Sequence, residues 1–515
     1  MADSNNANET KEKEPITWML IFTCFLCVFG SSVIFGYSTG VLNSPEEIFR
    51  SFYNETYTER FNKKMSDSLL NFLWAFTVSI YLAGGMIGIF SAGYLANRFG
   101  RRGAIQLSHI LAFAAALFFG IAKPSKRFEM IIVARFLIGL SSGIGGGVVP
   151  MYLTESSPKH IRGSLGVLHQ LGCTIGILIS QILGLEQLLG SEELWPVLLI
   201  FSAVPGFIVS FMLPFVPESP RYLLIIKKNE EQAKNALKAF RGEKHDIKND
   251  IAEMQEEQRQ MEIEPAWTMR QLLKSKKLRF PLIILAFLQT SQQCSGINVV
   301  FYYSTGIFKK AGIPDNYVQY ATIGAGAINV AMTTTAVFLM EKAGRRPLLL
   351  YGLIGMAISA AFITLGLNLQ DIAPGIAIVS FICTLTFVVS FAVGLGPIPL
   401  FIGGELFKQG PRPAAMSFTG MLNWLCNFLV GITFPFILDG FKGYTFLPFL
   451  VVVAIGAVIV YKYVKETKNK TYEEIAQIYY GKDDTTTVDA EIAQNGIKLE
   501  EIPSLENPGF TRDDQ

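Results

Sequence analysis

Long apolar stretches recur along most of this chain, and short polar or basic segments separate them. A helix that crosses the hydrocarbon core of a bilayer needs about 20 mostly apolar residues. Within lipid, backbone hydrogen bonds must be satisfied inside the segment, which favours helices. The pattern therefore predicts an all-α integral membrane protein with twelve transmembrane helices, at about 17–40, 70–95, 104–122, 128–150, 164–186, 194–213, 280–306, 317–340, 348–367, 376–402, 413–437 and 445–464.

The longest internal polar segment divides the predicted spans six and six. It is charged on most faces and rich in helix formers, which is typical of short solvated helices at a membrane surface. The end of the chain is acidic and poor in apolar residues, which favours disorder. The predicted parts are a tail (1–16), a six-helix bundle (17–213), a linker with short helices (214–279), a second six-helix bundle (280–464) and a mostly disordered tail (465–515).

Basic residues predict the orientation in the membrane. Arg101 and Arg102 follow the second span, and Arg345 and Arg346 follow the eighth. Short loops rich in Lys and Arg face the cytoplasm, so both tails are expected to be cytoplasmic in a multi-pass plasma-membrane protein. The loop after the first span is then outside, where Asn54, in the triplet "NET", is an acceptor for N-glycosylation.

The loop chemistry repeats in the two halves. "GRR" occurs at 100–102 and 344–346, Glu155 and Arg162 are seven residues apart, and Glu405 and Arg412 repeat that spacing. Such a repeat predicts a pseudo-symmetric transporter with its site between the halves, near the bilayer midplane. We expect Glu155 and Glu405 to pair with arginines of the opposite bundle and to close the cytoplasmic side. The predicted cytoplasmic gate comprises Arg101, Arg102, Glu155, Arg162, Glu218, Arg221, Arg345, Arg346, Glu405 and Arg412.

Composition excludes several other classes of protein. Half of the residues are hydrophobic, and the net charge of +2 is too small to indicate nucleic-acid binding. All six cysteines fall within predicted spans, which argues against a secreted disulfide framework. The four histidines show no metal-ligand spacing, and no nucleophile motif is present. We therefore expect no enzyme, metal or cofactor; the bilayer is one partner, and the sequence indicates no trafficking partner.

Several motifs together identify a family. The segments "PESPRYLL", "HQLG", "QQ-x-SGIN", "FYYSTGIF", "GPIP" and "GPRPAA" accompany the two "GRR" loops. Over about residues 15–480 the chain resembles the sugar-porter family of the major facilitator superfamily, and in particular the animal facilitative hexose transporters. The resemblance implies twelve helices in two bundles, alternating access, and downhill movement of D-glucose or a related hexose.

Buried amides are the candidate sugar ligands. Gln292, Gln293 and Asn298 lie in an apolar stretch, where an unpartnered amide is unfavourable by several kcal/mol. Amides both donate and accept hydrogen bonds, as binding of a neutral sugar requires. Gln292 and Asn298 lie some 120° apart on a straight helix, so a break at Ser295–Gly296 would help both to face one cavity.

The resemblance extends this set. It implies that Gln170, Asn329 and Asn423 also bind the sugar, with Trp424 as an aromatic face. It implies apolar walls at Ile177, Phe391 and Leu400, and an outer lid at Tyr302 and Tyr303. The alternative for each amide is a bond between helices, which we favour for Asn427.

Departures from the family leave the substrate open. Thr290 replaces a usual Leu, and Ala392 and Leu400 replace a Glu and a Trp of glucose-type members. A fructose-preferring or broad hexose carrier is therefore the first alternative. Proton-coupled relatives carry an Asp where this chain has Ser38, beside an Arg corresponding to Arg135, so uniport is favoured over proton symport. A non-transporting nutrient receptor is a further alternative, although the tail of about fifty residues is short for one.

Overall fold

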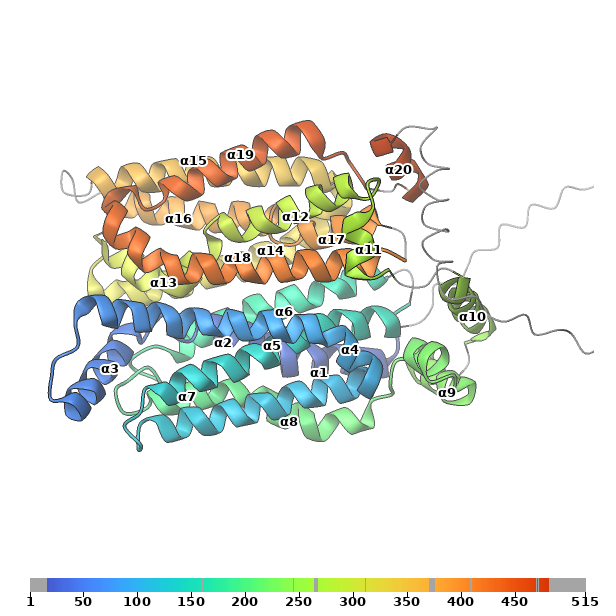
Figure 1. Cartoon of the computed structure of the whole chain (residues 1–515), viewed down its shortest axis with the longest axis horizontal. Helices are drawn as coiled ribbons and strands as arrows, with labels where there is room; N and C mark the ends of the chain where they lie inside the picture. The colour runs from blue at the N-terminus through green and yellow to red at the C-terminus, as the bar shows by residue number, and fades with distance from the viewer. Residues whose placement is uncertain are drawn as a thin grey trace, which may run out of the picture.

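In a computed structural model, the described part of the chain is helical throughout and contains no strand. That part is residues 16–480 without 159–160, 244, 264–266, 311, 370–375, 408–409, 469 and 471. Figure 1 shows two groups of roughly antiparallel helices side by side, one from each half of the chain. This arrangement agrees with the two helical bundles predicted from the sequence.

The first half contains six spans. The first is continuous through a π-helical turn, and the sixth through a 3-10 turn. The elements are α1 (Trp18–Cys27), η1 (Val28–Ser32), α2 (Val33–Gly40), α3 (Glu46–Phe61), α4 (Asp67–Ala122), α5 (Glu129–Ser156), α6 (Arg162–Leu183), α7 (Trp195–Ile200), η3 (Phe201–Ala203), α8 (Val204–Met212) and η4 (Leu213–Phe215).

The second half repeats this plan after the linker. The linker contains η5 (Tyr222–Ile226), α9 (Glu230–Arg241), α10 (Lys248–Ile263) and α11 (Met269–Lys274). The second half contains α12 (Arg279–Cys294), α13 (Ile297–Lys310), α14 (Asp315–Ala343), α15 (Arg345–Leu369), α16 (Ile376–Val393), α17 (Ile398–Leu406), α18 (Arg412–Phe441), η6 (Lys442–Tyr444) and α19 (Leu447–Tyr463). In the tail, α20 (Tyr472–Tyr480) forms a short helix, and 481–515 lie outside the described residues.

Eight helical stretches of the described chain are each long and apolar enough to cross a membrane. One of them, α4, contains two spans, because Gly100 leaves the helical region at φ 82°. The pair α12–α13 and the helices α6 and α19 complete the predicted twelve. The chain is therefore a multi-pass membrane protein, and α3 lies at one end of it while α9, α10 and α11 lie at the other (Figure 1). We call these the α3 end and the linker end.

The repeated "GRR" loops have a common geometry. Gly100 and Gly344 both adopt positive φ, 82° and 89°, a region that favours glycine. A Cβ on Gly100 would lie 2.4 Å from Glu218 Oε2, and one on Gly344 would lie 2.7 Å from Glu466 Oε2. Glycine at these positions therefore lets the turn approach a carboxylate closely in both halves.

Candidate functional site

The break predicted within the seventh span is present. The helix α12 ends at Cys294, Gly296 has φ 87°, and α13 begins at Ile297. Gln293 and Asn298 lie on opposite sides of this break, and the Asn298 amide donates to Gln293 Oε1 at 2.5 Å. The break thus brings together two amides that a straight helix would separate.

A side chain of a second helix, α18, bonds to these amides. Gln293 Nε2 donates to Asn423 Oδ1 of α18 at 3.0 Å, and Asn423 Nδ2 donates to Gln292 Oε1 at 2.7 Å. Asn423 Nδ2 also lies 2.8 Å from Gln289 Oε1. Gln289, Gln292, Gln293, Asn298 and Asn423 therefore form one hydrogen-bonded group. We call it the amide cluster.

Gln292 connects the cluster to a break in the tenth span. The chain leaves the helix between α16 and α17, in the segment "GLGP", and this frees backbone carbonyls. Gln292 Nε2 donates to Leu395 O at 2.8 Å and to Gly396 O at 2.6 Å. Irregular backbone at membrane depth is tolerated where such partners exist, so this amide also stabilises the break.

Two predicted ligands lie apart from the amide cluster. Asn329 is buried on α14 and Gln170 is half-buried on α6, and neither forms a hydrogen bond with another described residue. Sequence reasoning missed Gln289, which belongs to the cluster. Asn427, for which we favoured a bond between helices, accepts a hydrogen bond from the Tyr302 hydroxyl at 3.2 Å, and this bond joins α18 to α13. The spacing of four between Asn423 and Asn427 places them on one face of α18.

Trp424 packs between the halves. Its ring lies 5.5 Å from that of Phe35 and 6.3 Å from that of Tyr81, both of the first half. A Cβ on Gly85 would meet this indole at 2.0 Å, so the missing side chain there leaves room for it. Trp424 is buried, and it lies next to the amide cluster in sequence.

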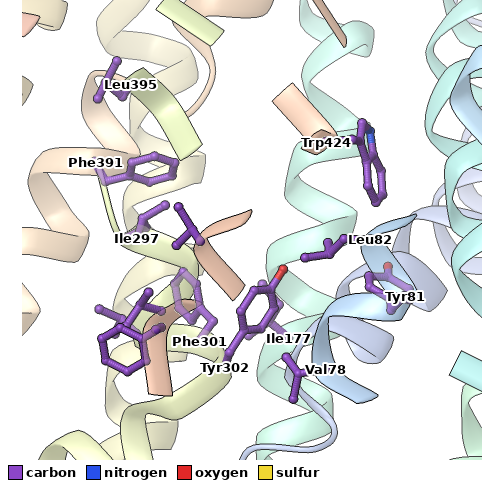
Figure 2. Close-up of a cluster of buried hydrophobic side chains, with 14 of the residues drawn as sticks. Val78, Tyr81, Leu82, Ile177, Ile297, Phe301, Tyr302, Phe391, Leu395 and Trp424 are labelled. Carbon is purple, nitrogen blue, oxygen red and sulfur yellow. The ribbon is translucent and has the colours of Figure 1, made fainter. Parts of the chain in front are cut away.

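Apolar side chains of both halves surround this region. Figure 2 shows Val78, Leu82 and Ile177 of the first half in one buried cluster with Ile297, Phe301 and Phe391 of the second. The predicted walls Ile177 and Phe391 therefore belong to this cluster. Leu400 lies outside this cluster, and 46% of the residue is exposed on α17.

The halves are joined at the α3 end. Asn43 Nδ2 donates to Ser304 Oγ at 2.5 Å, and Ser304 Oγ lies 3.2 Å from Thr322 Oγ1. Lys309 forms an ion pair of 2.6 Å with Glu47. Nearby, the hydroxyl of Tyr303 donates to Gly431 O at 3.1 Å, and like Tyr302 it is buried. The structure is therefore closed at the α3 end.

Glu155 and Glu405 do not form the predicted pairs between the halves in this conformation, among the described residues. Glu155 accepts two hydrogen bonds of 2.7 Å from Arg101 of its own half, and Glu405 pairs at 2.9 Å with Arg345 of its own half. Each arginine follows a glycine turn that places it within the same bundle as the glutamate, so neither reaches across. The networks therefore tie helix ends together within each half.

The two networks are closely similar. Glu218 accepts from the backbone N–H of Arg101 at 3.1 Å and of Arg102 at 3.2 Å. Glu466 accepts at 3.0 Å from the corresponding groups of Arg345 and Arg346. Burial raises the pKa of the Glu218 carboxyl. At Glu466 burial also acts to raise the pKa, but backbone N–H groups, that of Arg345 first, outweigh it and lower the pKa.

The other predicted gate residues whose side chains the structure describes bond within their own half or to the linker. Arg221 pairs with Glu257 of α10, and Arg412 donates to Phe407 O at 2.9 Å. Arg102 donates to Pro214 O at 3.2 Å and Arg346 to Tyr461 O at 2.8 Å. Arg162 begins α6, and its side chain lies outside the described part of the chain.

Arg135 is a buried cation that backbone carbonyls satisfy. Its guanidinium donates to Ser38 O at 2.5 Å and to Val78 O at 3.3 Å, and it lies 4.5 Å from the ring centroid of Tyr81. These partners are neutral. The place where proton-coupled relatives carry an Asp is thus occupied by a serine whose carbonyl contacts the arginine.

Comparison with known proteins identifies the family. The family description "Sugar (and other) transporter" matches residues 23–479. The chain belongs to this sugar transporter family. It is 47% identical over 445 residues to solute carrier family 2, facilitated glucose transporter member 1 of Gallus gallus, covering 86% of this chain and 90% of that protein. It is 46% identical over 468 residues to member 3 of Homo sapiens, covering 91% and 94%.

Solved structures of this transporter family share the fold. The partially occluded inward-open conformation of the xylose transporter XylE from E. coli matches with a TM-score of 0.73 and 25% identity, covering 88% of this chain and all of that one. The inward-open conformation of the same transporter also gives 0.73, with 89% of this chain covered. The protein is therefore a membrane transporter rather than an enzyme.

Proposed function

We propose that this protein is a facilitative hexose uniporter that moves D-glucose down its gradient across the plasma membrane by alternating access. The amide cluster at the break of the seventh span is the observation that carries the proposal. It joins five uncharged groups that donate and accept hydrogen bonds, beside an indole face, at the junction of the two halves. Relatives at 46–47% identity are named facilitated glucose transporters.

The proposed sugar ligands are the predicted amides together with Asn427. Gln292, Gln293, Asn298 and Asn423 exchange their mutual bonds for bonds to sugar hydroxyls, and Gln289 holds Asn423 in place. Gln170, Asn329 and Asn427 approach from the first half or from adjacent helices. Trp424 covers the C–H face of the ring, Ile177 and Phe391 form apolar walls, and Tyr302 and Tyr303 act as the lid.

We infer that the linker end is cytoplasmic and the α3 end is outside. The basic loops support this orientation, and so do the inward-open structures that the chain matches. In the closed outer seam, Asn43 bonds Ser304 and Lys309 pairs with Glu47; these bonds break when the halves rock. The charged networks within each half then keep each bundle rigid during that motion.

A substrate series tests the proposed function directly. In cells without hexose carriers, expression of the protein should produce saturable uptake of radiolabelled D-glucose, with L-glucose excluded. Ala392 and Leu400 favour the fructose-preferring or broad alternative, because they remove a polar partner and an aromatic wall. Uptake of fructose in preference to D-glucose would replace the substrate, and uptake of neither would refute hexose transport.

Uptake is expected to be indifferent to a protonophore and only weakly dependent on external pH. A proton relay needs an ionisable group that cycles within the membrane, whereas Arg135 is satisfied by carbonyls and faces Ser38. The measurement is accumulation of a non-metabolised hexose at equilibrium. An internal concentration above the external one that collapses with a protonophore would establish symport instead.

Asn54 is expected to be the sole glycan site. It lies on α3, at the proposed outer end, and its Oδ1 accepts from Met65 N at 3.3 Å. Glycosidase treatment should shift the wild-type protein on a gel and leave Asn54→Gln unchanged. A shift that persists in the variant would contradict the site or the topology.

A further inference from the structure

Gln181 is buried in the structure and has no hydrogen-bond partner among the described residues. It lies near the outer end of α6, only 1% of it is exposed, and neither of its amide atoms forms a hydrogen bond with another described residue. A buried, unpaired amide is unfavourable, and leucine would fill the same space without that penalty. The amide is therefore expected to gain its partner in another conformation.

The surroundings of Gln181 belong to the other half of the protein. A Cβ on Gly326 of α14 would lie 2.0 Å from Gln181 Oε1, so the glycine leaves space for this amide. One helical turn further out on α14, Thr322 bonds Ser304, which in turn bonds Asn43. Gln181 thus lies directly beneath the seam that closes the outer end, and opening that seam separates α6 from α14.

Gln181 also shares a helix face with two residues of the proposed site. At 100° per residue, Gln170 and Gln181 lie about 20° apart, with Ile177 between them on the same face. At 1.5 Å per residue Gln181 lies roughly 16 Å further out along the helix. Asn329 lies one turn inward from Gly326 on α14. Gln181 therefore places a polar group on the same face of α6 as Gln170, nearer the outer end of the helix.

We propose that Gln181 binds a hydroxyl of the incoming hexose when the outer end is open, as an outer station on the path to the amide cluster. The inference rests on the proposed function. An amide that both donates and accepts suits a sugar hydroxyl in any orientation. When the seam closes, the sugar has moved inward and Gln181 is buried against Gly326.

The first test removes the amide. In the full-length protein in cells, Gln181→Leu should raise the KM for D-glucose entry roughly tenfold to a hundredfold at normal surface abundance, because a hydroxyl leaving water loses its partner. The matched control is Ile182→Cys, at the neighbouring position whose side chain is 38% exposed and faces away. Its entry KM should stay at the wild-type value.

The second test measures exposure and sugar contact. In Gln181→Cys, an external membrane-impermeant thiol reagent should label the new thiol, and D-glucose but not L-glucose should slow the labelling several-fold. Ile182→Cys should show only the labelling of the wild-type protein.

A Gln181→Leu variant with unchanged entry KM, or labelling of Gln181→Cys that is absent or insensitive to D-glucose, would overturn the proposal. If the wild-type protein transports no hexose, the proposed function fails together with this inference. If the wild-type protein transports hexose and the Gln181 variants show none of the expected changes, this inference alone fails.

Discussion

Replacing Gln292 by Leu will lower hexose uptake per molecule at the cell surface by roughly ten- to a hundredfold. The variant loses two donors and one acceptor at nearly constant volume. A sugar hydroxyl that leaves water then lacks a partner, and the carbonyls of Leu395 and Gly396 lose the donor that lies 2.6 to 2.8 Å away. Both effects act inside the proposed site, and leucine itself is favoured in a membrane helix.

The measurement is uptake of radiolabelled hexose normalised to surface protein. Thr290→Leu is the matched control, because it introduces the same side chain two residues earlier, where glucose-type relatives usually have leucine. Thr290 lies near Cys426 and outside the amide cluster. Normalised uptake of Gln292→Leu at the wild-type level, with a reduced protein yield, would assign this residue to helix packing instead of sugar binding.

Glu155→Gln is expected to destabilise the protein more than the equivalent change in the second half, Glu405→Gln. The side chains of Arg101 and Glu155 are 7% and 14% exposed, and both carboxylate oxygens are bonded. Those of Arg345 and Glu405 are 20% and 26% exposed, and Glu405 Oε2 has no partner among the described residues. Removing one partner of a buried pair costs about 3–5 kcal/mol, and of an exposed pair about 0–1 kcal/mol.

The midpoint of thermal unfolding of the purified protein in detergent reports this difference. The expected order is wild type, then Glu405→Gln, then Glu155→Gln with the lowest midpoint. Glu59→Gln provides the control, because its pair with Lys126 is largely exposed and should contribute little. A Glu405→Gln midpoint as low as that of Glu155→Gln would show that burial does not set the strength of these two networks.

Distances along the sequence predicted much of the loop chemistry at the linker end but not its pairing. Equal offsets placed Glu155 and Glu405 at matching positions, and the structure gives them matching partners. The direction of pairing depended on the turns at Gly100 and Gly344, whose positive φ angles point each arginine back into its own bundle. A linear pattern carries no information about that direction, and among the described residues the expected bonds between the halves are not formed in this conformation.

Within the proposed site, some features could be predicted from the sequence and others could not. The break at Ser295–Gly296 was predictable, because an amide pair some 120° apart and a glycine between them are visible in the sequence. The role of Gln292 at the break of the tenth span was not, since its partners Leu395 and Gly396 lie more than a hundred residues away. Gln289 was missed for the same reason, since its partner Asn423 lies on another helix.

The sequence by itself determined the fold class, the twelve spans, the division into two halves and the family, because apolar length, helix periodicity and repeated motifs are properties of neighbouring residues. Only the tertiary structure decided which amides bond one another, which charges pair and which end is closed. Those contacts join residues such as Asn43 and Ser304, or Gln293 and Asn423, that are distant in the chain. They depend on how the helices pack, and packing fixes side-chain direction at distances that no local pattern specifies.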